Sequence, residues 1–323
     1  MTAGPLVVVG DTLYDLDISG TVTRHCPDAA SAPVLDAERA LGRPGGAGLA
    51  AVLAAATGVP VRLVTALADD REGEWLADTL GERVEMVAGP VLGATCLKVR
   101  LLDRGRPLVR VDHGQGTACP ATPDMLEALE DAGAVLVADY GRGISADPEL
   151  AKALAGLCDR VPVVWDPHPR GATPVPGCAM VTPNLAEARR ALRPTALADQ
   201  PDPAALDAAR LLPERWYARA AAVTAGALGA AVAVAGTAER VDAQLIPAAP
   251  APERADPCGA GDCFAAALAV ALLSDADPVA GVRAAVATAS EFVQAGGAAA
   301  VRLGAAPPRL PRRAQEGHHE PVY

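Results

Sequence analysis

The sequence predicts an α/β protein, a three-layer α/β/α domain around a mostly parallel sheet, with a second, small β-sheet beside it. Three observations predict this fold. Short apolar, β-branched runs alternate with helical patterns along most of the chain, as in parallel sheets covered by helices on both faces. Half of the 323 residues are apolar (51%), which is enough for a large core. Two segments whose strands have no helix between them interrupt the alternation.

The elements of the main sheet follow one another in a regular order. The first strand, expected at 6–9, is a run of Leu and Val that ends at Gly10. The further strands are expected at 61–67, 84–87, 135–138, 161–165, 179–181 and 220–224. The helices are expected at 45–57, 72–80, 125–132, 147–159 and 185–191. Since parallel strands end at one edge of their sheet, we expect a ligand at the loops that follow them.

The small sheet is expected from strands at 16–23, 32–41, 95–102 and 107–111. We expect these segments, within about 16–41 and 95–112, to form a lid over the carboxyl ends of the main strands. The alternative is that they are two surface hairpins. One domain is expected over residues 1–306, and a disordered tail over 307–323, where Pro and Arg are frequent.

Charge and composition exclude several classes of partner. The formal net charge is −11, so the surface does not attract nucleic acid or an anionic membrane. No apolar run reaches the roughly 18 residues of a transmembrane helix. The seven cysteines lack C-x-x-C spacing and no signal peptide precedes Pro5, which indicates reduced thiols and a cytoplasmic protein. An anionic ligand then needs a local basic pocket.

The strongest chemical signal is the stretch 256–264, a glycine turn that opens an alanine-rich helix. The backbone N–H groups of Gly259, Ala260 and Gly261 can bind an anion, and the helix dipole adds to the attraction. Asp262, beside that anion hole, can take a proton from an attacking hydroxyl. Phosphoryl transfer needs both parts. The alternative is that the glycines only end a loop and Asp262 only caps the helix.

Polar residues also follow the first strand. Asp11 and Asp15 come directly after it, and carboxylates suit the paired hydroxyls of a sugar. Gly45 and Gly46 open the next helix and permit close approach of a ligand to the backbone. The alternatives are a polar loop with a helix-cap aspartate and an ordinary glycine cluster.

Two later strands end in an acid and an arginine. Asp139 and Arg142 follow the strand at 135–138, and Asp166 and Arg170 follow the strand at 161–165. A guanidinium group matches phosphate geometry, so both arginines are candidate anion ligands. Surface salt bridges are the alternative.

The candidate nucleotide contacts lie further along the chain. Asn184 and Glu187 stand at i and i+3 of a helix start, where they could hold a hydrated Mg²⁺ that carries nucleotide phosphates. The same two residues could form a capping box, and the two roles are compatible. Thr224, Gly226 and Gly229 could contact phosphates through backbone N–H groups, or form a turn between strands. The chain lacks the P-loop pattern G-x-x-x-x-G-K-[ST].

Taken in order, these motifs resemble the ribokinase-like (PfkB) family of carbohydrate kinases over nearly all of residues 5–303. The resemblance implies ATP-dependent, Mg²⁺-requiring phosphorylation of a sugar hydroxyl. The roles that it implies are the base for Asp262, the anion hole for Gly259, Ala260 and Gly261, Mg²⁺ (through water) and phosphate for Asn184 and Glu187, the nucleotide for Thr224, Gly226 and Gly229, and the sugar for Asp11, Asp15, Gly45 and Gly46.

One branch of the family is more similar than the rest. The stretches at 10–15, 44–47 and 139–143 are similar to those of the D-glycero-D-manno-heptose-7-phosphate kinases. These phosphorylate the anomeric 1-hydroxyl of a sugar that already carries a phosphate on carbon 7. The similarity implies that Arg142, beside Asp139, binds the distal phosphate.

Four positions depart from the usual pattern. Cys258 stands where the family usually has Thr, and Leu49 stands where the branch usually has Asn. The branch usually has Lys at the positions of Arg142 and His168. Another sugar, sugar phosphate or nucleoside as substrate, or a catalytically silent sugar- or nucleotide-binding protein, therefore stay open as alternatives. Since the lid strands have exposed edges, a homodimer paired through the lid is also expected.

Overall fold

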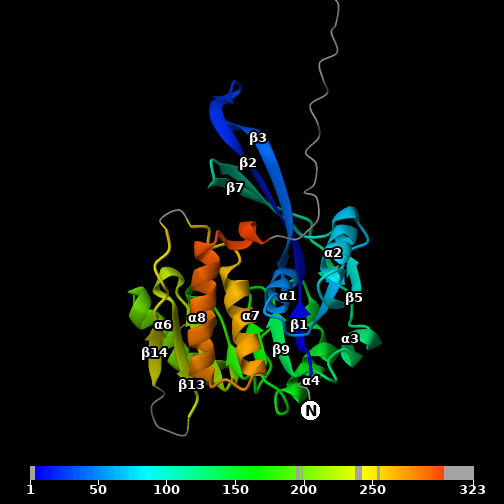
Figure 1. Cartoon of the computed structure of the whole chain (residues 1–323), viewed down its shortest axis with the longest axis vertical. Coiled ribbons are helices and arrows are strands. Elements are labelled where there is room, and N and C mark those ends of the chain that lie inside the picture. The colour runs from blue at the N-terminus through cyan, green and yellow to red at the C-terminus, as the bar shows by residue number, and fades with distance from the viewer. Residues whose placement is uncertain (1–3, 194–196, 198, 237–241, 253–254, 302–323) are drawn as a thin grey trace, which may run out of the picture.

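The structure, a computed structural model, describes residues 4–193, 197, 199–236, 242–252 and 255–301, so the predicted tail lies outside the described residues. A ten-stranded sheet forms the body, and a four-stranded sheet stands above it (Figure 1). This arrangement confirms the predicted fold class. Among the described residues, no helix is both long and apolar enough to cross a membrane.

The main sheet has the strand order β14-β13-β12-β11-β10-β9-β1-β4-β5-β8. Its strands are β1 (Leu6–Gly10), β4 (Val61–Leu67), β5 (Glu85–Leu92), β8 (Thr117–Ala118), β9 (Ala134–Ala138), β10 (Val163–Asp166), β11 (Met180–Val181), β12 (Ala220–Thr224), β13 (Ala230–Val234) and β14 (Ala243–Ile246). The strands from β12 to β5 pair in parallel, and antiparallel strands flank them at both edges. The carboxyl ends of the parallel strands therefore share one edge.

Helices cover both faces of this sheet. One face holds α1 (Ala47–Ala55), α2 (Arg71–Gly81), α7 (Ala260–Leu273) and α8 (Pro278–Gln294), and the other holds α3 (Pro123–Glu127), α4 (Pro148–Leu157), α5 (Leu185–Ala191) and α6 (Pro201–Trp216). Short 3-10 turns are η1 (Ile144–Ala146), η2 (Gly226–Leu228) and η3 (Gly297–Ala300). In β1, Leu6 and Val8 pack in one core and Val7 and Val9 in the other, since successive strand side chains point to opposite faces.

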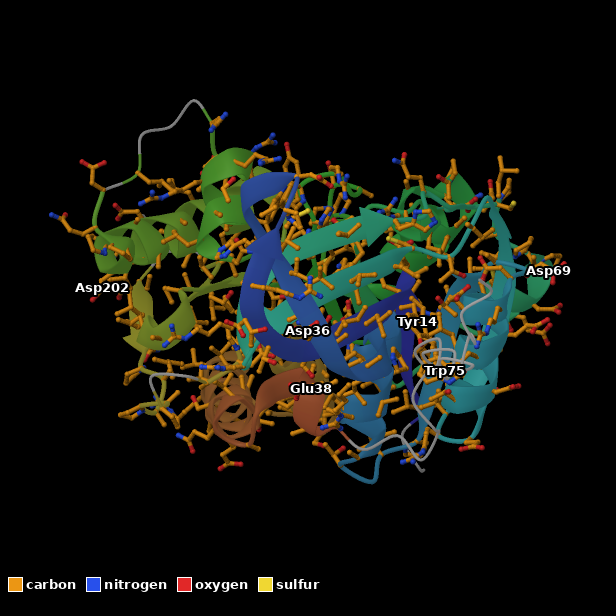
Figure 2. The ribbon with its side chains drawn as sticks, turned by 90° about the horizontal axis from the view of Figure 1, so that it is seen from above. Tyr14, Asp36, Glu38, Asp69, Trp75 and Asp202 are labelled. Carbon is orange, nitrogen blue, oxygen red and sulfur yellow. The ribbon has the colours of Figure 1, made fainter. Side chains whose placement is uncertain are left out.

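The small sheet has the order β3-β2-β6-β7. Its strands are β2 (Thr12–Cys26), β3 (Ala29–Gly46), β6 (Leu97–Asp103) and β7 (Arg106–His113). Strands β2 and β3 form a hairpin that is longer than predicted, because its pairing continues down to Thr12 and Gly46. The base of the hairpin thereby reaches the main sheet, and near it Tyr14 packs edge-on against Trp75 at 5.0 Å (Figure 2).

The sequence patterns missed several elements. Helix α6 was not predicted because its prolines suggest a break, yet the first of them, Pro201, occupies the first turn, where proline is tolerated. Helix α8 and strands β8, β13 and β14 were also not predicted. The helix expected from 45 begins at Ala47, because Gly46, at φ 60°, lies outside the helix as its N-cap.

Candidate active site

The predicted site residues gather at the carboxyl edge of the main sheet, below the small sheet. Site residues lie at or just after the carboxyl ends of five strands, β1, β9, β10, β11 and β12. The N-terminus of α7 brings the glycine turn to the same edge, and the base of the β2–β3 hairpin supplies Asp15 and Gly45. The structure therefore places at one edge residues that lie far apart in the sequence.

The glycine turn at Gly259 leads into α7 and has free space beside Gly261. Gly259 is the N-cap at φ 79°, where a Cβ would lie 2.8 Å from the Leu49 side chain. A Cβ on Gly261 would meet no atom within 4 Å outside its own helix turn, so this residue opens on free space at its side-chain position. An anion at this position would face backbone amides and the positive end of a fourteen-residue helix.

Asp262 lies in the first turn of α7 and is only 6% exposed. Its pKa is raised to about 7, first by burial and then by the charge of Asp15. The hydroxyl of Tyr140 donates to Oδ1 at 2.6 Å. This hydrogen bond and the charge of Lys98 lower the pKa and so act against burial and Asp15. A carboxyl with a pKa near neutral pH suits a general base, because it is ionised at working pH and still basic enough to take a proton.

Asp15 faces the site from the base of β2. It is buried, and its Oδ1 has no hydrogen-bond partner among the described residues. The Arg100 guanidinium lies 3.5 Å from Oδ2, and a Cβ on Gly45 would come within 2.7 Å of the same oxygen. A buried carboxylate oxygen without a partner is costly unless a ligand donates to it, which suits the predicted sugar contact.

Arg43 is a site residue that sequence reasoning missed. Its guanidinium is 2% exposed and donates to Asp17 Oδ2 at 2.6 Å. It also donates to the sulfur of Cys258 at 3.7 Å, directly before the glycine turn. Burial raises the pKa of this thiol. The arginine therefore connects the small sheet to the position where Cys258 departs from the family pattern.

The carboxylates of Asp11 and Asp139 accept hydrogen bonds from backbone amides. Asp11 Oδ2 accepts from the N–H groups of Tyr140 at 3.0 Å and Arg142 at 2.9 Å. Asp139 accepts from the N–H groups of Gly141 at 2.7 Å and, through its other oxygen, Ala172 at 2.8 Å. These bonds shape the loop that carries Tyr140 and Arg142. The predicted contacts of both aspartates with substrate stay predictions.

A cation and an imidazole ring contact the ring of Tyr140. The Lys98 ammonium lies 4.4 Å from the ring centroid, and the His168 ring stacks on it at 6.1 Å. The pKa of His168 is lowered to about 4, first by burial and then by the charges of Arg170, Lys98, Arg142 and Arg190. Lys98, which the motifs did not indicate, thus joins the predicted arginines.

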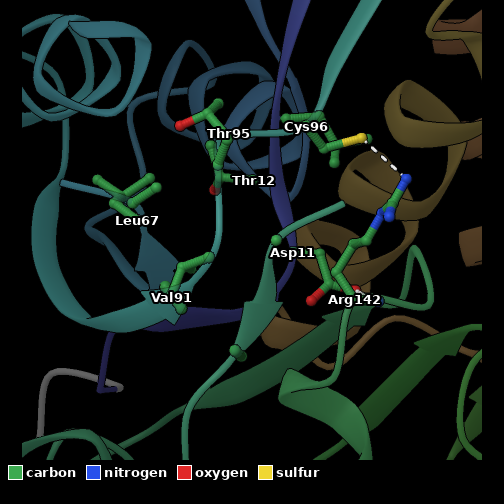
Figure 3. A pocket seen from close by; sticks show the side chains of 13 residues that line it. Asp11, Thr12, Leu67, Val91, Thr95, Cys96 and Arg142 are labelled. Carbon is green, nitrogen blue, oxygen red and sulfur yellow. Dashed lines mark hydrogen bonds between the residues drawn. The ribbon is translucent and has the colours of Figure 1, made fainter. Parts of the chain in front are cut away.

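A small pocket lies beside this cluster (Figure 3). Asp11, Thr12, Thr95, Cys96 and Arg142 are among its lining residues, and its volume is about 20 Å³. The Arg142 guanidinium donates to the Cys96 sulfur at 3.0 Å (Figure 3). A cavity of this size holds about one water molecule and is too small for a sugar.

Some of the predicted nucleotide-binding residues are used in contacts within the chain, and others face open space. Asn184 and Glu187 form the capping box, with bonds of 2.9 and 3.0 Å between each side chain and the other residue's amide. Asn184 also bridges to Thr224. Gly226, at φ 60°, faces open space, whereas a Cβ on Gly229 would collide with the Ile246 carbonyl at 2.0 Å.

Asp166, at the end of β10, completes the acidic side of the site. Thr182 Oγ1 donates to its Oδ1 at 2.9 Å. Burial raises its pKa well above the ordinary value, followed by the charges of Glu187 and Asp262. Among the residues that the structure describes, no group of three or more His, Cys, Asp or Glu side chains is arranged to hold a metal ion.

Thermal stability is expected to fall as the pH rises from 5 to 8. Burial raises the pKa values of Asp11, Asp139, Asp166, Glu187 and Asp262 above those of the unfolded chain. Such groups favour the folded state at low pH, and that stability is lost as the pH passes the folded pKa, about 7 for Asp262.

Calorimetric unfolding midpoints across this pH range check the expectation. Asp262→Asn should unfold at a higher temperature than the wild type at pH 8, and the two midpoints should approach each other at pH 5. A wild-type midpoint that rises between pH 6 and 8 would contradict the assignment of raised pKa values.

Comparisons with known proteins agree with this geometry. The model of the pfkB family carbohydrate kinases matches residues 5–303. The "Bifunctional protein HldE" of Streptomyces coelicolor is 42% identical over 301 residues, which cover 92% of this chain and 62% of that protein. The protein of the same name from Azorhizobium caulinodans is 36% identical over 282 residues, 83% of this chain and 56% of that protein. The chain thus spans less than two thirds of the length of these relatives.

Solved structures agree on the fold. The ribokinase of Arabidopsis thaliana, complexed with ribose and ATP, superposes with a TM-score of 0.69, covering 92% of this chain and 94% of that chain at 24% identity. The family resemblance inferred from the motifs is confirmed, since the family match spans nearly the whole described chain. The chain belongs to the pfkB family of carbohydrate kinases.

Proposed function

We propose that the chain transfers the γ-phosphoryl group of ATP to the anomeric 1-hydroxyl of D-glycero-D-manno-heptose 7-phosphate, with Asp262 as the base. The observation that carries the proposal is the buried carboxyl of Asp262 behind the open glycine turn. Membership of a carbohydrate kinase family and the relatives named HldE support it. The ribokinase structure with ATP supports ATP as the phosphoryl donor.

The reaction needs one proton transfer and one displacement. The sugar hydroxyl gives its proton to Asp262 while its oxygen bonds to the γ-phosphorus, and the bond from that phosphorus to the β–γ bridging oxygen breaks to release ADP. The amides of Gly259, Ala260 and Gly261 then face the charge that develops on the transferring group. Asp15, with its free Oδ1, orients a sugar hydroxyl.

The residues present fit Mg²⁺. Asp166 and Glu187 lie close enough that the charge of Glu187 raises the pKa of Asp166, and a divalent cation would offset this repulsion. Mg²⁺ keeps several water ligands and commonly binds through one or two carboxylates and substrate phosphates. In the proposal Asn184 and Glu187 hold it through water, and when bound it neutralises phosphate charge. Thr224, Gly226 and Gly229 lie along the nucleotide on the same side.

Arg142 and its neighbours are assigned to the distal phosphate of the sugar. The charges of four cations, Arg170, Lys98, Arg142 and Arg190, all lower the pKa of His168, so the side of the site around His168 is basic. Such a local basic group is what an anionic substrate needs on a chain with a net charge of −11. The proposal places the phosphate on carbon 7 there.

Arg142→Gln is therefore expected to weaken binding of heptose 7-phosphate by about tenfold or more, because a charge-assisted hydrogen bond is lost. Binding of the unphosphorylated heptose should not change. Isothermal titration calorimetry with both sugars measures the difference. Arg219→Gln is the matched control, since Arg219 precedes β12 at the opposite end of the sheet and pairs with Asp159. Equal losses for both sugars would contradict the role of Arg142.

The small sheet is proposed as a lid over the sugar, and as the face of a homodimer. Every residue of β7 is exposed, including Leu108, Val109 and Val111, which are 41–48% exposed. An edge strand with exposed apolar side chains can pair with a second copy. Light scattering measures the mass in solution.

The function is tested by ATP turnover with a panel of sugars, namely heptose 7-phosphate, fructose 6-phosphate, ribose and nucleosides. Turnover with heptose 7-phosphate above the others supports the proposal. Turnover with another member alone would replace the substrate and keep the kinase. Binding without turnover on every sugar would favour a silent binding protein, an alternative suggested by Cys258 and Leu49.

A further inference from the structure

Tyr140 is fixed at four points around the site. Its backbone N–H donates to Asp11 at 3.0 Å, and its hydroxyl donates to Asp262 Oδ1 at 2.6 Å. Its ring contacts the Lys98 ammonium and the stacked His168 ring. A residue with its backbone amide, its ring and its hydroxyl all in contact with neighbours has little freedom to turn. The position of the hydroxyl oxygen is therefore well defined.

Asp262 in turn depends on this contact. Among the described residues, the Tyr140 hydroxyl is the one group that donates a hydrogen bond to its carboxylate. The helix N-cap is Gly259, which has no side chain to hold the aspartate. Without Tyr140 the carboxyl group could rotate about its Cβ–Cγ bond, because no other bond fixes its plane.

We infer, on the basis of the proposed function, that Tyr140 is a positioning residue for the base. Its hydroxyl holds Oδ1 of Asp262, so Oδ2 is the oxygen that accepts the proton of the attacking sugar hydroxyl. Tyr140 keeps its own proton throughout. The hydrogen bond also favours the ionised carboxylate, since it is made to the charged form.

The charges around Tyr140 and Asp262 determine in which direction the pKa of Asp262 changes when the Tyr140 hydroxyl is removed. Asp15 and Asp166 face Tyr140 and Asp262 from β2 and β10, and Lys98 faces them from β6. Burial, then the charge of Asp262, and after it those of Asp166 and Asp15 raise the pKa of the Tyr140 hydroxyl well above its ordinary value, so this group stays protonated and remains a donor. Removal of the hydroxyl leaves the burial and the Asp15 charge, which both raise the pKa of Asp262.

Tyr140→Phe tests the inference through the pH profile of kcat. The acid limb, which reports ionisation of the base, should move to higher pH by about one unit, a tenfold change in the protonation equilibrium. Turnover at pH 7 should fall by about fivefold and recover almost fully at pH 9. Tyr217→Phe is the matched control, since Tyr217 is 75% exposed, and its profile should coincide with that of the wild type. A lower kcat with an unmoved acid limb would overturn the inference.

A titration without substrate separates this inference from the proposed function. In the full chain labelled with ¹³C at aspartate Cγ, the signal lost in Asp262→Asn identifies the base. Its midpoint should rise by about one pH unit in Tyr140→Phe even if no sugar is turned over. An unchanged midpoint would overturn the inference whatever the activity. If Tyr140→Phe does not fold, 3-fluorotyrosine at position 140, a stronger donor, should lower the midpoint, and an unchanged or raised midpoint would overturn the inference.

Discussion

Replacement of Asp262 by asparagine is expected to lower kcat by at least about a hundredfold, the lower range for losing a positioned base. Asparagine has nearly the same shape and can still accept from the Tyr140 hydroxyl, so the start of α7 should keep its structure. It cannot take a proton from the sugar at neutral pH. The rate of sugar-dependent ADP release, measured at saturating ATP and sugar, gives kcat directly.

Asp277→Asn is the matched control for this variant. Asp277 caps α8, the helix that follows α7, where it accepts from the amides of Val279 and Ala280. The same chemical change there should leave kcat within about twofold of the wild type, because surface substitutions have small effects. Turnover of Asp262→Asn near the wild-type rate would contradict the role of Asp262 as the base.

Replacement of Asp15 by asparagine is expected to lower kcat/KM by about 10- to 100-fold, the range of one hydrogen bond to a charged group. Its Oδ1 is buried without a partner, which suits a hydroxyl of the sugar. The acid limb of the kcat profile should also move to lower pH, because the charge of Asp15 raises the pKa of Asp262. Initial rates at several sugar concentrations and pH values give both results.

Asp36→Asn offers a control on the same hairpin. Asp36 lies on β3 (Figure 2). It forms an exposed ion pair with Arg24 at 3.3 Å. Exposed pairs contribute little, so this variant should keep the kinetics of the wild type. If Asp15→Asn and Asp36→Asn behave alike, Asp15 does not bind the sugar.

Local patterns were sufficient to predict much of the fold. Strand β4 and helix α5 have the predicted bounds, because an apolar run with β-branched residues and a capping box define them locally. Strand β12 also has the predicted bounds, 220–224. The patterns underestimated the β2–β3 hairpin, whose length depends on pairing between Thr12 and Gly46. Alanine-rich strands such as β13 lack a β-branched signal, and tertiary packing decides them.

The parts of the candidate site that were predicted are motifs confined to a few consecutive residues. The glycine turn with Asp262 and the pair Asn184 and Glu187 are of this kind. Contacts between distant segments were not predictable, such as the bond from Tyr140 to Asp262, 122 positions apart. Arg43 carried a weak signal, a charged residue directly before Pro44-Gly45-Gly46, but its partners lie 26 and 215 positions away.

Phosphorus NMR of the reaction with D-glycero-D-manno-heptose 7-phosphate, ATP and Mg²⁺ tests the central claim most directly. The account predicts ADP and a sugar that carries a second phosphate on its anomeric oxygen with the wild type, and no such product over the same time with Asp262→Asn. ATP consumption with no phosphorylated sugar, or equal product from the wild type and Asp262→Asn, would contradict it.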